Sequence, residues 1–207
     1  MTATSPTRCD STDITVPPLR AERQKLTQRL LHAATELMLT HGYTATSIDR
    51  IAEHAGCTRG TFFAHFGHKQ QIGHEVADTM ARHAIQRIRR FQPCHGDHVV
   101  ATLATWASIL VRRPGWIRLE LDLADLDPAS RTQTNQRLNH LRDTIRDMLA
   151  TATATAPPDS SVDLDVTISF LLSVLVGMAT QHTHNLGMPQ TAIRPHIALV
   201  LRTAGIG

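Results

Sequence analysis

The stretch TATSIDRIAEHAGCTRGTFFAHFGHK, residues 44–69, decides the fold of this chain. Two short runs within it have apolar residues at helical spacing, and a turn at Gly56 separates them. Thr46 and Asp49 fit a capping box at the start of the first run, and Thr58 is a capping residue directly before the second. The stretch therefore predicts a helix, a tight turn and a second helix.

A third helix is needed to bury the apolar faces of these two, because neither has enough apolar residues for a core of its own. Phe62 and Phe66 lie one helical turn apart in the second helix and are predicted to point inward. The chain from Arg20 repeats apolar residues at helical spacing up to a stop at His41 and Gly42. Three helices in this order predict a helix-turn-helix, whose second short helix presents its N-terminal residues to the DNA major groove.

The outward face of that second short helix carries side chains suited to DNA. Arg59 can read guanine with two hydrogen bonds, and Gly60 lets the backbone approach closely. Thr61 and His65 can reach phosphate oxygens. Helix phase places Phe63 on the same face, although a shift of one residue would place it in the core instead.

Composition and charge favour a soluble protein with an anionic partner. Of the 207 residues, 42% are apolar and 19% are charged, and three cysteines exclude a disulfide-stapled fold. Residues 1–95 carry 12 basic and 8 acidic side chains, whereas residues 96–207 carry 9 and 10. The positive surplus is therefore N-terminal, and 19 of the 21 basic residues are arginine, whose planar fork suits phosphate and guanine.

Neither a secretory signal nor a membrane span is expected. The N-terminus has no apolar run typical of a signal peptide. The most apolar run, Val166–Ala179, has 14 residues, fewer than the roughly 20 needed to cross a bilayer. These features predict a cytoplasmic protein that does not enter a membrane.

The pattern IxxIAxxAGxTxGTFFxHFxxK over residues 48–69 resembles the DNA-binding signature of the tetracycline-repressor (TetR) family. The resemblance covers roughly residues 22–75. It implies an all-α homodimer that binds double-stranded, palindromic operator DNA. It also implies that the DNA is released when a small-molecule effector enters the C-terminal domain, so that the chain regulates transcription, usually as a repressor.

The resemblance assigns roles to single residues. Arg59 and Gly60 match positions that usually face bases. Phe63 stands where the family often has a tyrosine, and His68 stands where a capping Ser or Asn is frequent. Together with the cap Thr58, the residues expected to contact DNA are Thr46, Thr58, Arg59, Gly60, Thr61, Phe63, His65 and Lys69.

The whole chain is predicted to be all-α, with about nine helices in two domains. Residues 1–19 are rich in Ser, Thr and Pro and are expected to form a disordered arm. Residues 20–90 are predicted to form the helix-turn-helix domain with a connecting fourth helix. Residues 95–207 are predicted to form a helical domain for ligand binding and dimerisation.

One segment of the second domain has a misleading pattern. Residues 117–123 alternate between apolar and polar side chains like a strand, but no second strand-like run exists to pair with them. A short helix buried on more than one side is therefore predicted. Asp127 and Pro128, a cap followed by a first-turn proline, predict the start of the next helix.

Small residues mark a candidate dimer interface near the C-terminus. Ser169, Ser173 and Gly177 recur every four residues along an otherwise bulky apolar helix, which lets another helix approach closely. The resemblance assigns this stripe to the dimer interface, and close packing within one subunit is the alternative.

A pocket for a largely apolar effector is expected around the corner at residues 114–115, which the two tryptophans flank. A plain core filled by the same side chains explains the pattern equally well. The candidate lining residues are Leu103, Trp106, Leu110, Trp116, Phe170, Met178 and His182.

Other functions have less support from the sequence. No phosphate loop, nucleophile elbow or metalloprotease motif is present, so neither an enzyme nor a cofactor is expected. The His/Cys clusters at residues 94–98 and 182–184 make a metal- or redox-responsive DNA-binding regulator the alternative, although neighbouring positions do not converge easily on one ion. Arg20, Arg23 and Lys25 either form a minor-groove arm or simply lie on the first helix.

Overall fold

The computed structural model describes residues 18–90 and 115–153, with short helical pieces at 165–166, 168–170, 172–173, 176–177, 195 and 197–199. Every regular element in these residues is a helix, so the predicted all-α fold is confirmed. None of the described helices is both long and apolar enough to span a membrane. The helices with described bounds are α1 (Pro18–His41), α2 (Ile48–His54), α3 (Arg59–His65), α4 (Lys69–Arg90), α6 (Gly115–Ala124) and α7 (Pro128–Thr153).

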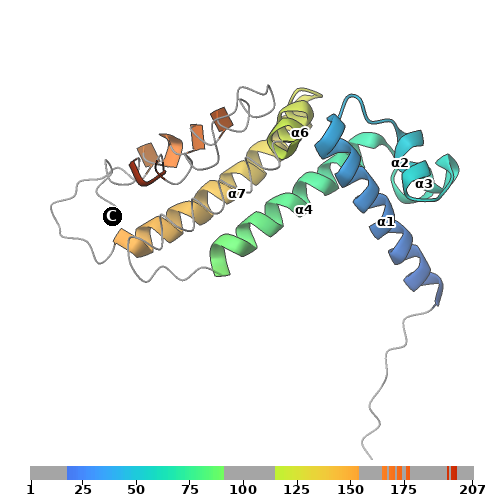
Figure 1. Ribbon diagram of the computed structural model, residues 1–207, viewed down its shortest axis with the longest axis horizontal. Coiled ribbons are helices and arrows are strands. Elements are labelled where there is room, and N and C mark those ends of the chain that lie inside the picture. The colour runs from blue at the N-terminus through green and yellow to red at the C-terminus, as the bar shows by residue number, and fades with distance from the viewer. Residues whose placement is uncertain are drawn as a thin grey trace, which may run out of the picture.

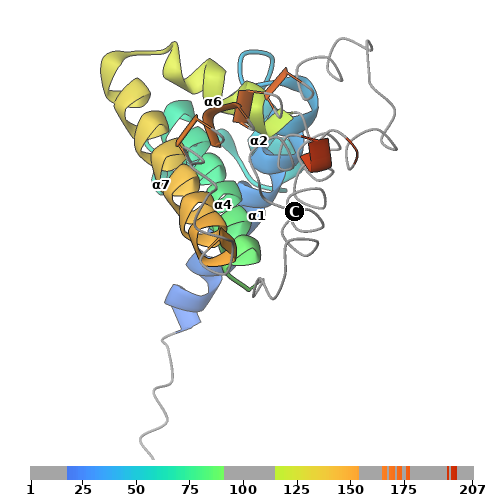
Figure 2. The same ribbon diagram turned by 90° about the vertical axis from the view of Figure 1, so that its left-hand side faces the viewer.

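The described helices form a small cluster and a longer pair that leads away from it (Figure 1). α1, α2 and α3 lie together at one end, and α4 leads from α3 to the opposite end beside α7. In the second view α4 and α7 again lie side by side (Figure 2), and α6 packs against α1, α4 and α7. Of the expected N-terminal arm, residues 1–17 lie outside the description, whereas Pro18 and Leu19 already belong to α1.

One apolar core joins the helix-turn-helix to α6. Met38 of α1, Ile51 of α2 and Phe62 of α3 are completely buried in it. Leu119 and Leu123 of α6 are completely buried in the same core. A displacement of α6 would therefore disturb the packing of the first three helices.

α6 also touches the backbone at the end of α1. Gly42 ends α1 with φ +89°, a left-handed conformation that glycine adopts without strain. The following residue, Tyr43, donates its N–H to the Asp122 carboxylate of α6 at 3.2 Å. Gly115 is buried at the start of α6, and a Cβ there would overlap the Leu39 carbonyl. Only glycine allows α6 to lie this close to α1.

Residues 117–123 are helical, as predicted against their alternating pattern. α6 buries Leu119 and Leu123 in the shared core, and Trp116 and Glu120 are buried as well. The buried residues fall on one face of this helix, whereas Leu121 is 56% exposed, so the predicted burial on more than one side is wrong. The predicted start of α7 is also confirmed, because the Asp127 side chain accepts the N–H of the third α7 residue at 2.8 Å.

Candidate nucleic-acid interface

α2, the turn and α3 form the predicted helix-turn-helix. Ser47 is the N-cap of α2, and its hydroxyl accepts the N–H of Arg50 at 3.2 Å. Thr58 caps α3 as predicted, accepting the N–H of Thr61 at 3.2 Å. Between the helices Gly56 has φ +64°, which allows the tight turn.

Thr46 is not the N-cap of α2, so the predicted capping box is wrong. The Thr46 side chain is buried, and its hydroxyl donates to the Gly42 carbonyl at 2.8 Å. Asp49, the other expected member of the box, binds Arg59 instead. A buried hydroxyl that is already bonded to the backbone cannot reach a phosphate, so the expected contact between Thr46 and DNA is corrected as well.

Arg29 of α1 holds the turn in place. Its Nε donates to the Ala55 carbonyl at 2.9 Å, and its Nη2 donates to the carbonyls of Ala55 and Gly56, the latter at 3.0 Å. These carbonyls lie at the C-terminal end of α2, where a cation is favourable. The role of Arg29 could not be predicted from the sequence, because its partners are more than 25 positions away and nothing in the local pattern points to them.

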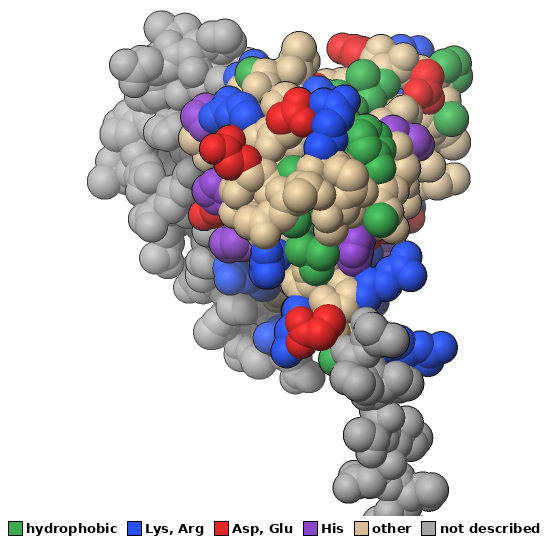
Figure 3. All heavy atoms as spheres, turned by 90° about the vertical axis from the view of Figure 1, so that its right-hand side faces the viewer, with side chains coloured by type: hydrophobic (Ala, Val, Ile, Leu, Met, Phe, Trp, Pro, Cys, Tyr) green, Lys and Arg blue, Asp and Glu red, His purple; other side chains and the backbone are tan. Residues whose placement is uncertain are grey.

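The face of α3 that points away from the core is exposed. Phe62 is completely buried, whereas Phe63 is 43% exposed, so Phe63 lies on the surface rather than in the core. Arg59 and Gly60 are also exposed. A Cβ at Gly60 would meet nothing closer than 3.8 Å, so the fold itself does not require glycine there. Figure 3 shows this end of the molecule, where basic side chains are spread over the surface with acidic ones among them.

Arg59 is held between an acidic and an aromatic side chain. Its Nη1 donates to the two carboxylate oxygens of Asp49 at 2.9 and 2.7 Å. Its Cζ lies 5.5 Å from the centroid of the Phe63 ring, within range of a cation–π interaction. Phe63 meets the buried Phe62 edge-on, with ring centroids 5.7 Å apart. The phenylalanine that replaces the family's usual tyrosine therefore supports the arginine.

His65 and Thr61, two expected phosphate contacts, make contacts within the domain. His65 Nδ1 lies 2.9 Å from the hydroxyl of Thr27 in α1. The Thr61 hydroxyl lies 2.8 Å from the hydroxyl of Thr58. Both side chains are partly exposed, so their contacts with DNA stay predictions.

Lys69 links α4 to the loop before α2. Its Nζ donates to the carbonyls of Tyr43 and Thr46 at 3.0 and 3.1 Å and lies 4.2 Å from the centroid of the Tyr43 ring. Burial lowers the pKa of Lys69, and Asp122 opposes this effect. The ammonium has three donors. The predicted contact between Lys69 and a DNA phosphate therefore depends on the third N–H donor.

The N-terminal basic residues lie on α1 rather than in an extended arm. Arg20, Arg23 and Lys25 are all helical. Lys25 pairs with Glu22 at 2.9 Å. Arg23 donates to the Ala64 carbonyl of α3 at 3.4 Å. The structure therefore favours the second alternative for this segment, basic side chains on the surface of α1.

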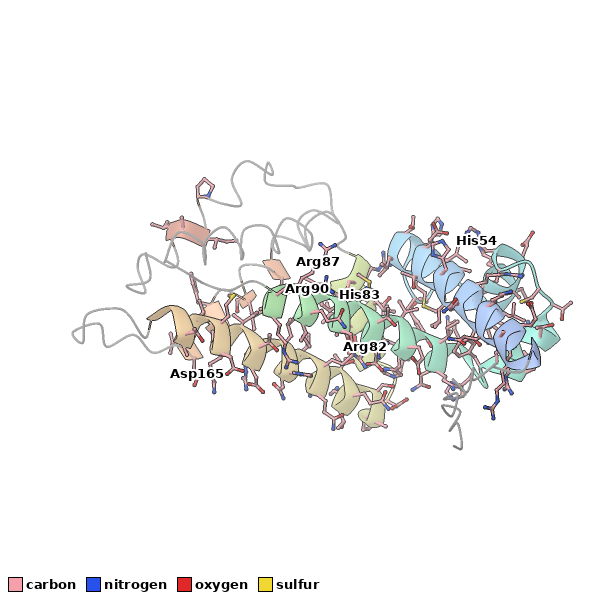
Figure 4. All side chains as sticks on the ribbon, turned by 90° about the horizontal axis from the view of Figure 1, so that it is seen from below. His54, Arg82, His83, Arg87, Arg90 and Asp165 are labelled. Carbon is pink, nitrogen blue, oxygen red and sulfur yellow. The ribbon has the colours of Figure 1, made fainter. Side chains whose placement is uncertain are left out.

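The start of α4 follows the helix-turn-helix directly, whereas its other end lies away from it. At its start, the Nδ1 of His68 accepts the N–H of Gln71 at 3.1 Å, so the histidine ring replaces the Ser or Asn that the resemblance implies. At its other end, Arg87 and Arg90 are exposed and lie away from α1–α3 (Figure 4). They form an exposed helix end and do not extend the surface of α3.

Comparison with known proteins identifies the helix-turn-helix region. Residues 30–76 match the family model described as bacterial regulatory proteins, tetR family. Residues 30–76 are a TetR-family domain. The match confirms the resemblance to the TetR family that the sequence pattern indicates.

Two curated regulators of Pseudomonas putida match a segment of similar length in this chain. The HTH-type transcriptional regulator SrpR and the uncharacterized HTH-type transcriptional regulator TtgW are each 36% identical over 52 residues, or 25% of this chain. The match spans 24% of SrpR and 39% of TtgW. The sequence likeness to them therefore concerns a domain rather than the whole protein.

Solved structures resemble a larger part of the chain. FadR from Bacillus subtilis, in complex with stearoyl-CoA, has a TM-score of 0.70 at 16% identity and covers 84% of this chain and 96% of its own. A tetR-family regulatory protein from Rhodococcus RHA1 has a TM-score of 0.71 at 18% identity and covers 88% and 98%. The fold seen in TetR-family structures therefore extends beyond the TetR-family domain of this chain.

The predicted effector pocket lies largely outside the described residues. Trp116 is buried, and its Nε1 donates to Glu120 at 3.1 Å. Phe170 is 56% exposed in the protomer, and its place in the wall of an effector pocket stays a prediction. The described residues form one pocket of about 550 Å³ beside α1 and α2 and another of about 420 Å³ between α4 and α7. Neither pocket is lined by the residues predicted to bind the effector. The predicted residues outside the description are Leu103, Trp106, Leu110, Met178 and His182.

The described part of the chain contains no group of three or more His, Cys, Asp or Glu side chains that could hold a metal ion. The clusters at residues 94–98 and 182–184, on which the metal- or redox-responsive alternative depends, lie outside that part.

A buried polar cluster joins α4, α6 and α7. Arg137 of α7 donates from Nη2 to Glu120 of α6 at 2.6 Å, and the two side chains are only 9% and 5% exposed. Arg137 Nη1 lies 3.2 Å from Asp78 of α4. Trp116 bonds to the same Glu120 carboxylate. The cluster could not be predicted from the sequence, because Glu120 is one polar position in an alternating run and its partner Arg137 is 17 residues away.

His74 of α4 completes this cluster as a neutral ring. Arg137 Nη1 lies 3.3 Å from His74 Nδ1, and Arg137 can only donate. The other ring nitrogen, Nε2, therefore carries the proton and donates to the Ser130 hydroxyl at 2.9 Å. Burial and the charge of Arg137 lower the pKa of His74, against Asp78, Glu120 and Asp127, which raise it.

We expect stability to fall as the pH is lowered through the range in which His74 titrates. The unfolded chain takes up this proton near the ordinary pKa of 6.5, whereas the folded chain takes it up only at lower pH. The stability that the neutral His74 ring contributes is therefore fully present above pH 6.5. It is lost as the pH falls toward the lowered pKa of His74 in the folded chain. Urea unfolding at a series of pH values should show a steeper acid loss for wild type than for His74→Gln. Equal slopes would contradict the role of His74.

Proposed function

We propose that this chain is a transcriptional regulator, a repressor, that binds palindromic operator DNA through α3 as a homodimer. The observation that carries the proposal is the exposed Arg59 at the start of α3. Its helix rests on the buried Phe62 and follows a turn that Arg29 holds. This is the arrangement in which a helix-turn-helix reads base edges in the major groove.

A gel shift over a series of salt concentrations tests this proposal. Labelled DNA from around the gene of this protein is titrated with the full chain, with and without an excess of random competitor DNA. Specific binding predicts a complex that survives the competitor. Binding that is lost to competitor at every salt concentration would be phosphate contact alone and would contradict operator recognition.

The dimer is proposed to form along the stripe of Ser169, Ser173 and Gly177. All three residues are exposed in the protomer, together with the neighbouring Phe170. The Ser173 hydroxyl donates to the Ser169 carbonyl at 2.8 Å, so it packs along its own helix rather than projecting outward. An exposed face of small residues beside a large aromatic suits close packing against a second helix.

Gly177→Leu is expected to shift the protein from dimer to monomer and to abolish operator binding. A Cβ at Gly177 would meet nothing within 4 Å, so the protomer itself accommodates the side chain. Sedimentation velocity measures the change, and Gln133→Leu on the exposed surface of α7 is the matched control. A Gly177→Leu dimer with wild-type affinity for DNA would place the interface elsewhere.

The effector is proposed to be a largely apolar small molecule that acts on DNA binding through α4 and α6. The FadR structure from Bacillus subtilis holds stearoyl-CoA, which has a long apolar chain. In this protein α6 shares the core of the TetR-family domain and packs against α4. Operator half-sites lie about 34 Å apart, so a shift of these helices that changes the distance between the two α3 helices lowers affinity. A thermal-shift assay with stearoyl-CoA as the first probe tests this class of ligand.

A further inference from the structure

We propose that Asp49 is a positioning residue that fixes which edge of the Arg59 guanidinium faces the DNA, and thereby sets a guanine preference in the operator. The proposal rests on the proposed function, in which Arg59 contacts a base. Asp49 lies in the first turn of α2, so it belongs to the helix that precedes the reading helix.

The geometry restrains Arg59 from two sides. The single nitrogen Nη1 donates to Asp49 Oδ1 and Oδ2 at 2.9 and 2.7 Å. The Phe63 ring supports the guanidinium carbon at 5.5 Å. Asp49 belongs to α2 and Phe63 to α3, so the fold of the helix-turn-helix sets the direction of the arginine.

The contact with Asp49 leaves a defined edge for DNA. A guanidinium carries five N–H donors in a rigid plane, and guanine is read by two of them, which bind its O6 and N7. Because Nη1 is bound to Asp49, the edge formed by Nε and Nη2 is the one that can pair with guanine. An arginine that is already oriented loses less side-chain freedom when it binds, which favours the correct base.

The pair formed by Asp49 and Arg59 contributes little to the stability of the domain. The two side chains are 59% and 62% exposed, and an exposed ion pair contributes little to folding. A carboxylate on a surface that faces DNA also repels the phosphates. Asp49 should therefore weaken binding to DNA in general while sharpening the choice of base, and this opposite effect on the two quantities distinguishes positioning from a merely structural role.

The test compares Asp49→Asn with wild type on a library of duplexes that contain about 20 random base pairs, enough for two half-sites. Wild type is expected to select a motif with a guanine at one position of each half-site. For Asp49→Asn the ratio of affinities for guanine and adenine at that position should fall about tenfold, within the usual worth of one bidentate contact. The affinity of Asp49→Asn for random DNA should rise, because the variant removes a charge that repels the phosphates.

Two further variants make the result specific. Glu53→Gln removes the same charge from an exposed position of α2 and should leave the guanine ratio unchanged. Arg59→Ala should lose the same guanine preference, and adding Asp49→Asn to it should change that ratio no further, because the two side chains act as one unit.

Each outcome decides between the proposals. If wild type selects no motif, operator recognition fails and the role of Asp49 fails with it. If wild type selects a motif and Asp49→Asn keeps the full guanine ratio, only the role of Asp49 is overturned. If Asp49→Asn instead loses a cytosine preference that Arg59→Ala retains, Asp49 contacts a base directly and is not a positioning residue.

Discussion

Replacing Glu120 with alanine is expected to lower the free energy of unfolding by about 3–5 kcal/mol, because it leaves a buried cation without its closest partner. The Arg137 side chain is only 9% exposed, and Glu120 holds both its Nε and its Nη2. The indole of Trp116 loses its acceptor in the same variant. Urea unfolding followed by circular dichroism measures the loss.

Two controls separate the buried charge from other causes. The double variant Glu120→Leu with Arg137→Met removes both charges and should recover most of the stability, because two apolar side chains can fill the space of a buried pair. Glu22→Ala breaks the exposed pair with Lys25 and should change stability by less than about 1 kcal/mol. A loss for Glu120→Ala no larger than that for Glu22→Ala would show that the cluster does not stabilise the junction of α4, α6 and α7.

Phe62→Ala is expected to cost about 3–5 kcal/mol as well, because a fully buried aromatic leaves a cavity when it is truncated. Phe62 is completely buried in the core that α1, α2, α4 and α6 share. It also packs against Phe66, with ring centroids 5.8 Å apart. α3 is a short helix, so its position depends on this contact and operator binding should be lost together with stability.

Phe63→Ala is the matched control, since it removes the same side chain from the next position. Phe63 is 43% exposed, so its truncation should cost about 1 kcal/mol or less. It should weaken the guanine preference through Arg59 rather than unfold the domain. Equal losses of stability for the two variants would mean that α3 is not anchored through Phe62.

The helix-turn-helix could be predicted from the sequence because its signals are local. Thr58 caps α3 with its own side chain, and Gly56 provides the turn within the same few residues. The helical form of residues 117–123 was also predictable, because a lone strand has no partner. In the first case the decisive interactions lie within the segment itself. In the second, the sequence offers no strand-like run that could pair with residues 117–123.

The error in the cap of α2 is local, whereas the omissions concern partners that are distant in the sequence. Thr46 and Asp49 have the right spacing for a capping box, but Arg59 binds the carboxylate and Ser47 takes the cap. The two carbonyls that Lys69 binds come from a loop more than 20 positions earlier. Such pairs appear only once the helices are packed.

The most direct test of operator recognition by α3 is the ratio of dissociation constants for operator DNA and random DNA at physiological salt, measured for wild type and Arg59→Ala. Wild type is expected to prefer the operator by at least about 10³-fold. Arg59→Ala should lose about 1–3 kcal/mol on the operator and much less on random DNA. Equal losses on both kinds of DNA, or a wild-type ratio near one, would contradict base reading by Arg59.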